Sequence, residues 1–381
     1  MKKILKLIFC FFILITMNVH AQKGKEILYV GTYSDRGSEG IYVFEFDRAK
    51  GSLTPVQTIV DKKSPIFVEV HPSGKYLYST NVGGTEEKPD LGSFSSFTID
   101  NKTGKLTFLN NTSSLGAEPC HITIDEKGKW AFVSNYGGGN VAVFPIEKSG
   151  KISASSDLKQ FSGSSVNKDR QEASHIHSAI LSPDQKYLYV SDLGTDKIEI
   201  FEVDAAKGLL TPAQKPEIAV NPGSGPRHFV FHPNGKYAYG SEELSSSVCS
   251  FSFNKATGAL EIIKDNIVAI PEDYSGENYP ADIDTDPAGK FLFMSNRGLN
   301  SVATFSIDND GSLKLLGNES TQGDWPRGFL VDKKGEFLFV ANQKSDDISV
   351  FKLDQKTGRL TFTGTQVKVP SPVCLKMLHL K

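Results

Sequence analysis

The chain of 381 residues is 39% hydrophobic and 23% charged, a balance that supports a large core and excludes a disordered protein. Its 34 glycines and 18 prolines indicate short elements joined by tight turns, which favours an all-β fold. The formal net charge of -2 leaves no basic excess for binding phosphate backbones, so nucleic acid is not expected as a partner.

The first 21 residues have the layout of a secretory signal. Three lysines accompany an apolar run over residues 4–17, and small residues end the segment at Ala21. We therefore expect cleavage of residues 1–21 and export of the mature chain, residues 22–381, to the periplasm or the medium. No window of the mature chain holds the roughly 18 apolar residues that a membrane-spanning helix needs, so no membrane span is expected.

An internal repeat runs through the mature chain. A Gly-containing turn followed by an aliphatic residue recurs seven times, at residues 50–53, 103–106, 149–152, 207–210, 257–260, 310–313 and 357–360. The glycines of successive copies are 46 to 58 residues apart, which fits one four-stranded propeller blade. The sequence therefore predicts a β-propeller of seven blades.

A second motif, typical of a hairpin turn followed by a strand, precedes the Gly-containing turn within the repeat unit. It is HPSGKYLY at residues 71–78, with related copies at 182–189, 232–239 and 286–293. Because His71 and His232 recur within this motif, we interpret them as structural. The strand then ends at an Asn or Asp that also recurs, namely Asn81, Asn135, Asp192, Asn296 and Asn342. We interpret these residues as turn structure and not as metal ligands.

The two ends of the chain together complete one blade. Residues 27–54 contain three strands of a unit, and residues 371–378 match the opening strand of other units, such as residues 64–70. We expect the C-terminal strand to pair with the N-terminal blade and close the ring, so that residues 22–381 form a single domain. Three longer polar connections are expected to be surface loops: residues 82–93, 154–173 and 264–279.

Two rings of side chains are predicted at one mouth of the central channel, where the first strand of each blade begins and the second ends. The first ring is Ile66, Cys120, His177, Arg227, Ala281, Arg327 and Val373. The second ring is Tyr33, Val82, Tyr136, Leu193, Glu243, Arg297 and Gln343. Polar members gather in blades 4 to 7, and two more histidines, His121 and His228, lie one residue past the first ring.

This group of residues has a definite chemistry. Arginines bind a carboxylate or phosphate, a carboxylate activates water, and an imidazole transfers a proton near neutral pH. An ordinary ion pair between neighbouring blades, or a histidine of the core, is the structural alternative for each member. No nucleophile elbow, HExxH motif or phosphate-binding loop is present in the sequence, which argues against those enzyme classes.

The cysteines give no sign of a metal or redox site. Cys120, Cys249 and Cys374 of the mature chain are too far apart for a metal knuckle or a CxxC pair, and we expect buried thiols. No metal and no other cofactor is predicted.

Several segments resemble a known family, the seven-bladed propeller lactonases, over nearly all of the mature chain. They are NYGGGNVAV at 135–143, DLGTD at 192–196, GPRHFVFHP at 225–233, Glu243-Leu244 and SNRG at 295–298. The family includes cycloisomerase-type 6-phosphogluconolactonases and carboxymuconate cyclases. The resemblance implies catalytic roles for His177, Arg227, Glu243 and Arg297. The positions in and beside the two rings make His121, His228, Arg327 and Tyr136 weaker candidates for substrate binding. Glu242 stands where the family usually has Asn, and the sequence leaves open whether Glu242 or Glu243 faces the channel.

The resemblance implies hydrolysis of a sugar lactone of the 6-phosphogluconolactonase type. Glu243 or His177 would activate a water, while Arg227 and Arg297 would hold the anionic substrate and stabilise the oxyanion. Two alternatives remain open: a lactonising enzyme similar to the carboxymuconate cyclases, and a non-catalytic periplasmic propeller that binds an anion or a partner. The expected partner is a small anionic lactone, and a monomer is assumed.

Overall fold

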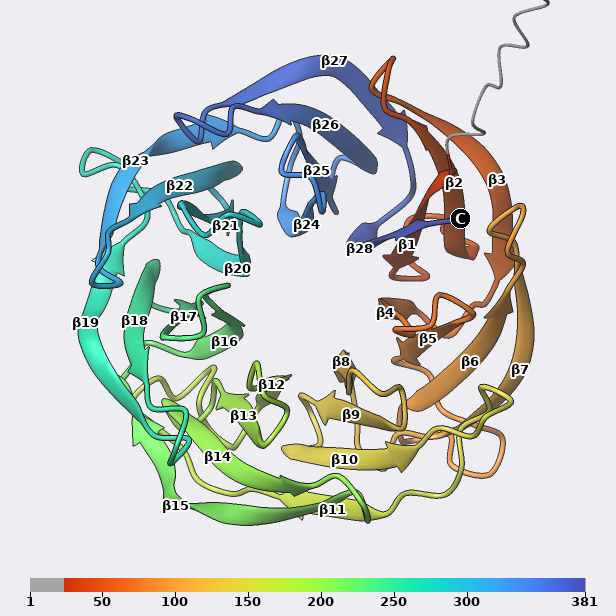
Figure 1. Ribbon diagram of the computed structural model, residues 1–381, viewed down its shortest axis with the longest axis horizontal. Helices are drawn as coiled ribbons and strands as arrows, with labels where there is room; N and C mark the ends of the chain where they lie inside the picture. The colour runs from red at the N-terminus through yellow and green to blue at the C-terminus, as the bar shows by residue number, and fades with distance from the viewer. Residues whose placement is uncertain (1–23, 381) are drawn as a thin grey trace, which may run out of the picture.

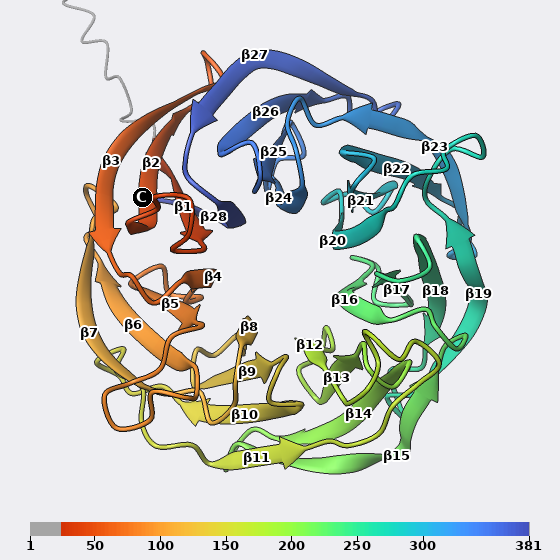
Figure 2. The same ribbon diagram turned by 180° about the vertical axis from the view of Figure 1, so that it is seen from behind.

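The protein is a ring of seven antiparallel four-stranded sheets, seen down its axis from one face in Figure 1 and from the other in Figure 2. The computed structural model describes residues 24–380, all of whose regular elements are strands. The all-β, seven-bladed architecture predicted from the repeat is confirmed. The expected signal segment, residues 1–21, lies outside the described residues. Among residues 24–380 there is no helix of the length and apolarity that crossing a membrane requires.

The blades follow the repeat. Blade 1 consists of β28 (Pro372–His379), β1 (Glu26–Thr32), β2 (Gly40–Asp47) and β3 (Ser52–Val60). Blade 2 consists of β4 (Pro65–Val70), β5 (Tyr76–Asn81), β6 (Ser93–Ile99) and β7 (Leu106–Ser113). Blade 3 consists of β8 (Pro119–Ile124), β9 (Trp130–Asn135), β10 (Asn140–Pro145) and β11 (Asp157–Gln160). Blade 4 consists of β12 (Ile176–Leu181), β13 (Tyr187–Asp192), β14 (Lys197–Asp204) and β15 (Leu209–Ala219).

The remaining blades have the same order from the axis outward. Blade 5 consists of β16 (Pro226–Phe231), β17 (Tyr237–Glu242), β18 (Ser247–Phe253) and β19 (Leu260–Val268). Blade 6 consists of β20 (Tyr279–Thr285), β21 (Phe291–Arg297), β22 (Ser301–Ile307) and β23 (Leu313–Ser320). Blade 7 consists of β24 (Pro326–Val331), β25 (Phe337–Asn342), β26 (Asp347–Leu353) and β27 (Leu360–Lys368).

Both ends of the chain close the ring, as the sequence predicts. Strand β28 pairs with β1 in an antiparallel register that places Glu26 opposite His379 and Val30 opposite Leu375. Apolar side chains fill the space between neighbouring sheets; between blades 1 and 7, the ring of Phe46 lies edge-on against that of Phe339, with centroids 4.8 Å apart. Since each blade buries its faces only against its neighbours, the C-terminal strand is part of the core of blade 1.

Recurrent polar residues join the blades and do not line the channel. The imidazole Nε2 of His71 lies 2.9 Å from the carbonyl oxygen of Gly128 in the next blade, and that of His232 lies 2.7 Å from the carbonyl of Gly289. The backbone φ of Gly128 is +66°, and an added Cβ would lie 2.1 Å from the His71 ring, so a side chain cannot be accommodated there. The structural interpretation of His71 and His232 is therefore confirmed.

The strand-ending Asn residues are also structural. The amide of Asn81 donates to the hydroxyls of Ser93 and Ser95, and that of Asn342 donates to the carboxylate of Asp347. These bonds satisfy buried groups within the sheet, whereas the sequence interpretation placed them in turns.

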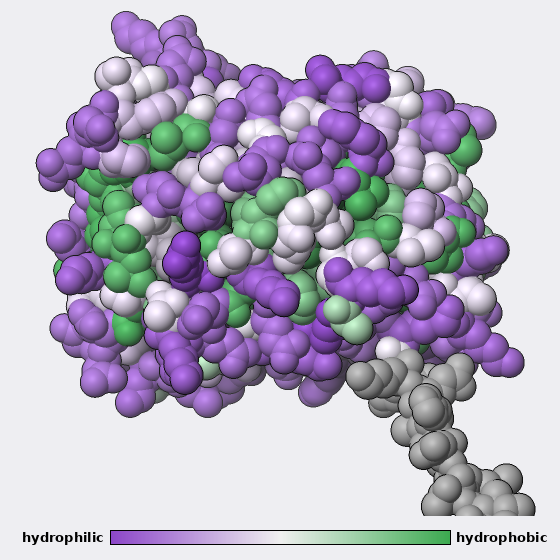
Figure 3. Space-filling model, turned by 90° about the horizontal axis from the view of Figure 1, so that it is seen from above, coloured by the Kyte–Doolittle hydropathy of each residue, from purple (hydrophilic) through white to green (hydrophobic). Residues whose placement is uncertain are grey.

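Two expected loops are partly strands. Residues 264–268 of the expected loop 264–279 continue β19 and pair with β18. Within residues 154–173, Asp157–Gln160 form β11, which pairs with β10 from Val143 to Asn140. The exposed edge of β10 offers unpaired backbone groups, and a strand of four residues is enough to cover them. The outer rim that such strands form is mostly hydrophilic with scattered apolar side chains when seen edge-on (Figure 3).

Candidate active site

A β-bulge in the first strand of every blade directs side chains into the channel. In each blade, a residue near the start of the first strand has no pairing partner on the second strand, so the first strand contains one extra residue at this point. The skipped residues are Ile66, Cys120, His177, Arg227, Ala281, Arg327 and Val373. In blades 5 and 6 the skip is one residue longer and includes His228 and Asp282. The first ring predicted from sequence is therefore a ring of bulges.

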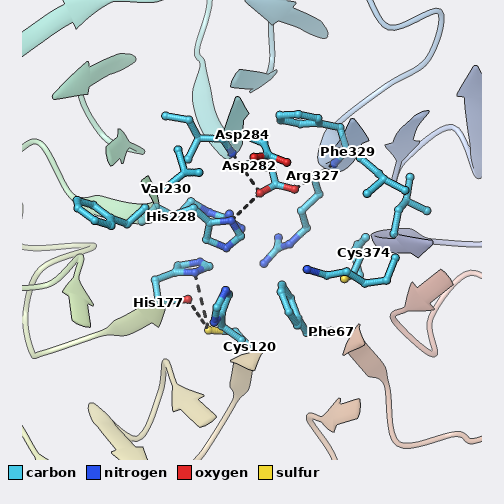
Figure 4. A pocket seen from close by; sticks show the side chains of 18 of the residues that line it. Phe67, Cys120, His177, His228, Val230, Asp282, Asp284, Arg327, Phe329 and Cys374 are labelled. Atoms are coloured by element: carbon cyan, nitrogen blue, oxygen red, sulfur yellow. Dashed lines mark hydrogen bonds and ion pairs between the residues drawn. The ribbon is translucent and has the colours of Figure 1, made fainter. Parts of the chain in front are cut away.

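Two cavities open along the channel. The upper cavity, about 280 Å³, contains Tyr136, Glu243 and Arg297 at the mouth where the first strands begin. The lower cavity, about 210 Å³, lies deeper and is shown in Figure 4. Four residues line both cavities and mark the junction between them: Ile66, Cys120, His177 and Arg327.

Glu243 is held by three arginines. Its Oε2 accepts a hydrogen bond from the Nε of Arg227 at 2.9 Å and forms an ion pair with the Nη2 of Arg297 at 2.8 Å, and its Oε1 accepts a hydrogen bond from the Nη2 of Arg170 at 2.6 Å. The side chains of Glu243, Arg227 and Arg297 are at most 5% exposed. Burial alone would raise the pKa of Glu243, but the charges of Arg297 and Arg227 outweigh it and hold the pKa well below its usual range. Three guanidinium groups around one carboxylate leave an excess of positive charge for an anion.

His177 is an uncharged imidazole beside this cluster. It is 5% exposed, and burial, followed by the charge of Arg227, holds its pKa well below 6.5. The thiol of Cys120 lies 3.8 Å from its Nδ1. His177 therefore has a lone pair available at neutral pH, at the junction of the two cavities.

The two weaker histidine candidates lie in the lower cavity. The Nδ1 of His228 is 2.8 Å from Asp282 Oδ1, and the ring centroid of His228 is 5.4 Å from those of His121 and His177. Burial, followed by the charge of Arg227, lowers the pKa of His228 to about 4. Among residues 24–380, the buried Nδ1 of His121 has no hydrogen-bond partner. The sequence placed these histidines at the same mouth as Glu243, and the structure shows that they line the deeper cavity.

The chain is similar over nearly its whole length to known proteins. A family model described as lactonase, 7-bladed beta-propeller, matches residues 27–377. The chain belongs to this family. It is 35% identical over 356 residues to the 6-phosphogluconolactonase of Bacillus subtilis (strain 168), an alignment that covers 93% of this chain and 99% of that protein. It is 38% identical over 359 residues to the 6-phosphogluconolactonase of Formosa agariphila, with coverage of 92% and 99%.

A solved structure of the same family is similar throughout. The periplasmic gluconolactonase of Pseudomonas aeruginosa superposes with a TM-score of 0.86 at 31% identity, covering 94% of this chain and all of that one. The resemblance proposed from the sequence motifs is therefore confirmed at the level of the family.

This lactonase-family channel contains residues that sequence reasoning missed. Arg170 comes from the connection between blades 3 and 4, and Tyr279 and Trp325 line the upper cavity at the starts of blades 6 and 7. The guanidinium carbon of Arg297 lies 5.7 Å from the centre of the Trp325 ring. Arg170 stands in a segment without repeat pattern, so no sequence signal marked it. Tyr136, which the sequence did select, lies in the upper cavity with its ring stacked on His175 at 4.4 Å.

The orientation of the two adjacent carboxyl groups in blade 5 of this lactonase-family protein is now defined. Glu243 lines the upper cavity, whereas Glu242 is inside the blade and accepts a 2.6 Å bond from the hydroxyl of Ser247. Among residues 24–380, one group of three potential metal ligands has donor atoms within 4.8 Å of one another, namely Glu242, Cys249 and Asp265. None of the three lines either cavity.

Proposed function

We propose that this protein hydrolyses a sugar lactone, with 6-phosphogluconolactone and gluconolactone as the candidate substrates. Support comes from relatives bearing the name 6-phosphogluconolactonase and from a structural neighbour named a periplasmic gluconolactonase, each more than 30% identical over nearly the whole chain. In this reaction water attacks the lactone carbonyl, the ring C–O bond breaks, and a hydroxy acid forms.

His177 is the proposed general base. The observation that carries this role is that both oxygens of Glu243 are bonded to guanidinium groups, while the imidazole of His177 is uncharged and lies at the junction of the cavities. A carboxylate with a strongly lowered pKa is a poor base, whereas a neutral imidazole accepts the proton of the attacking water. Glu243 is then a positioning residue that holds the arginines.

Arg227 and Arg297 are the proposed oxyanion stabilisers. Arg227 uses Nε on Glu243 and Nη1 on the carbonyl oxygen of Ala281, which leaves Nη2 for the substrate. Arg297 uses Nε on the carbonyl of Tyr279 and Nη2 on Glu243, which leaves Nη1. Groups fixed in this way before the substrate arrives stabilise developing negative charge without reorganisation.

Export is part of the proposal. The predicted signal over residues 1–21 and the similarity to a periplasmic enzyme support a location outside the cytoplasm. An exported enzyme meets lactones of the periplasm or medium, so the unphosphorylated sugar lactone is tested beside the phosphorylated one.

The test measures hydrolysis of both lactones by the mature protein, corrected for spontaneous ring opening. His177→Gln is expected to lower kcat by about 10²- to 10⁴-fold. His379→Gln, which removes a half-buried imidazole at the far end of β28, is the matched control and should keep full turnover. A folded His177→Gln protein with wild-type kcat would remove His177 as the base. Absence of turnover on both lactones by the wild type would overturn the proposed function and favour a cyclase or an anion-binding propeller.

A further inference from the structure

Arg327 differs from the other arginines of the channel. Arg170, Arg227 and Arg297 all bond to Glu243, whereas no carboxylate of residues 24–380 lies within ion-pair distance of the Arg327 guanidinium. Its guanidinium carbon lies 5.3 Å from the centre of the Tyr33 ring, and Figure 4 shows its head reaching into the middle of the lower cavity. An unpaired cation at the junction of two cavities is a ready partner for an anionic ligand group.

Other polar side chains line the lower cavity from three further blades. Lys376 on β28 lines it, with its ammonium 2.7 Å from Glu69. The Nδ1 of His121 is buried without a partner among residues 24–380. The imidazole of His228 is uncharged and its Nδ1 donates to Asp282, so its Nε2 is a hydrogen-bond acceptor. An unsatisfied buried polar atom is costly unless a ligand or water completes it, so the unpaired nitrogen of His121 indicates a binding site.

The acidic groups of the lower cavity are already engaged or partly neutral. Asp282 bonds to His228 through Oδ1 and accepts the backbone amide of Phe329 through Oδ2 at 3.1 Å. Burial, followed by the charge of Asp282, raises the pKa of Asp284 to about 7, and Glu69 is paired with Lys376. Asp282 keeps its negative charge, because its partners are an uncharged imidazole and a backbone amide. Among the cations that line the lower cavity, Arg227 and Lys376 are paired with carboxylates, and Arg327 is the one without a carboxylate partner among residues 24–380.

We propose that the lower cavity binds an oxyanion at the end of the substrate remote from the lactone carbonyl, with Arg327 as its principal contact and with His121 and His228 beside it. This inference rests on the proposed function, which places the lactone carbonyl beside His177 at the junction of the two cavities. The volume of about 210 Å³ accommodates a phosphate or a carboxylate, and the shared lining gives one substrate access to both cavities. Phosphate and carboxylate present the same bidentate chemistry to a guanidinium, and the experiment separates them.

The experiment compares kcat/KM for three lactones: 6-phosphogluconolactone, glucarolactone with a terminal carboxylate, and neutral gluconolactone. In the wild type at least one anionic lactone is expected to be preferred over the neutral one. Arg327→Gln is expected to lower that preference at least tenfold, mainly through KM, while Arg359→Gln, an exposed arginine of the same blade, leaves it unchanged. The cavity recognises the anionic group whose lactone loses more of its excess kcat/KM over gluconolactone in Arg327→Gln.

Two results would overturn the inference while leaving the lactonase function intact. One is equal kcat/KM for anionic and neutral lactones in the wild type, and the other is an Arg327→Gln protein that loses the same factor on all three. A titration with inorganic phosphate, followed by the imidazole ¹⁵N signals, tests the site without turnover. Shifts of the His121 and His228 signals in the wild type, absent from Arg327→Gln, support it. Unshifted signals overturn it, even if no lactone is hydrolysed.

Discussion

Glu242 makes folding stability depend on pH. It is fully buried at the position that Asn occupies in blades 2, 3, 6 and 7, and among residues 24–380 its Oε1 has no hydrogen-bond partner. Burial, followed by the nearby charge of Asp265, raises its pKa from 4.5 to about 8. Glu242 is therefore protonated in the folded protein over most of the neutral range, but ionised in the unfolded chain.

The sign and size of the effect follow from linkage. A carboxyl group whose pKa is raised on folding contributes stability that is complete below the unfolded pKa of 4.5 and is lost as the pH rises towards the folded value of about 8. The full difference corresponds to about 5 kcal/mol, of which roughly 3 kcal/mol falls between about pH 5 and about pH 8. Gln at this position keeps the shape and cannot ionise, so Glu242→Gln should be unaffected by this term.

The assay is equilibrium unfolding by denaturant at several pH values for the wild type, Glu242→Gln and the exposed control Glu202→Gln. We expect the stability advantage of Glu242→Gln over the wild type to grow by roughly 3 kcal/mol between about pH 5 and about pH 8, while Glu202→Gln follows the wild type. Asp284 and Glu199, whose pKa values are also raised to about 7, are present in all three proteins and cancel in the comparison. Parallel curves for wild type and Glu242→Gln would refute the reasoning. A wild type destabilised by EDTA at pH 8 would show that a cation, and not a proton, neutralises Glu242 and Asp265.

Three further predictions concern the site and the closure of the ring. Glu243→Gln leaves the buried charges of Arg227 and Arg297 without their carboxylate, so we expect a loss of about 3 to 5 kcal/mol of unfolding free energy together with loss of turnover; a variant with wild-type stability in denaturant would contradict the buried ion pairs. Removal of residues 371–381 deletes the partner of β1, so the product should lack a cooperative thermal transition by calorimetry, whereas a cooperative soluble protein would contradict closure by β28. Lactone hydrolysis should be unchanged after dialysis against EDTA, and inhibition would point to a metal in the reaction.

The fold was predictable because each blade repeats the same short sequence motifs. The Gly turn before Leu106 and the hairpin motif at residues 71–78 each mark one strand boundary, and their recurrence counts the blades without any knowledge of long-range contacts. The terminal pairing followed from counting strands in the incomplete N-terminal unit. The strand Asp157–Gln160 escaped prediction because its four residues, three of them polar, are too few to show an alternating pattern, and the free edge of β10 makes them a strand.

The site was predictable only in part, because two kinds of information are absent from the repeat. The bulge positions can be counted from the recurring Pro, as for Arg327, or from the equivalent position where Ile176 replaces it, as for His177. The depth of a side chain depends on its distance from the start of the first strand: the residue after the first-ring position, such as Phe67, His121 or His228, lines the lower cavity, and the hairpin pattern alone does not show where the two cavities divide. Arg170 reaches Glu243 from a connecting segment whose path no period describes.

Seven equivalent bulges supply seven positions around one axis, and the side chains at these positions decide the chemistry. Ile66 and Val373 close one side of the channel with apolar groups, which keeps water away and strengthens the charges opposite. On the other side, Arg170, Arg227 and Arg297 share the single carboxylate of Glu243, and Arg327 at the junction has no carboxylate partner among residues 24–380. An anionic substrate is attracted by this excess of guanidinium groups, whereas a neutral lactone is not. For this reason the comparison of charged with neutral lactones tests the arrangement of the whole channel.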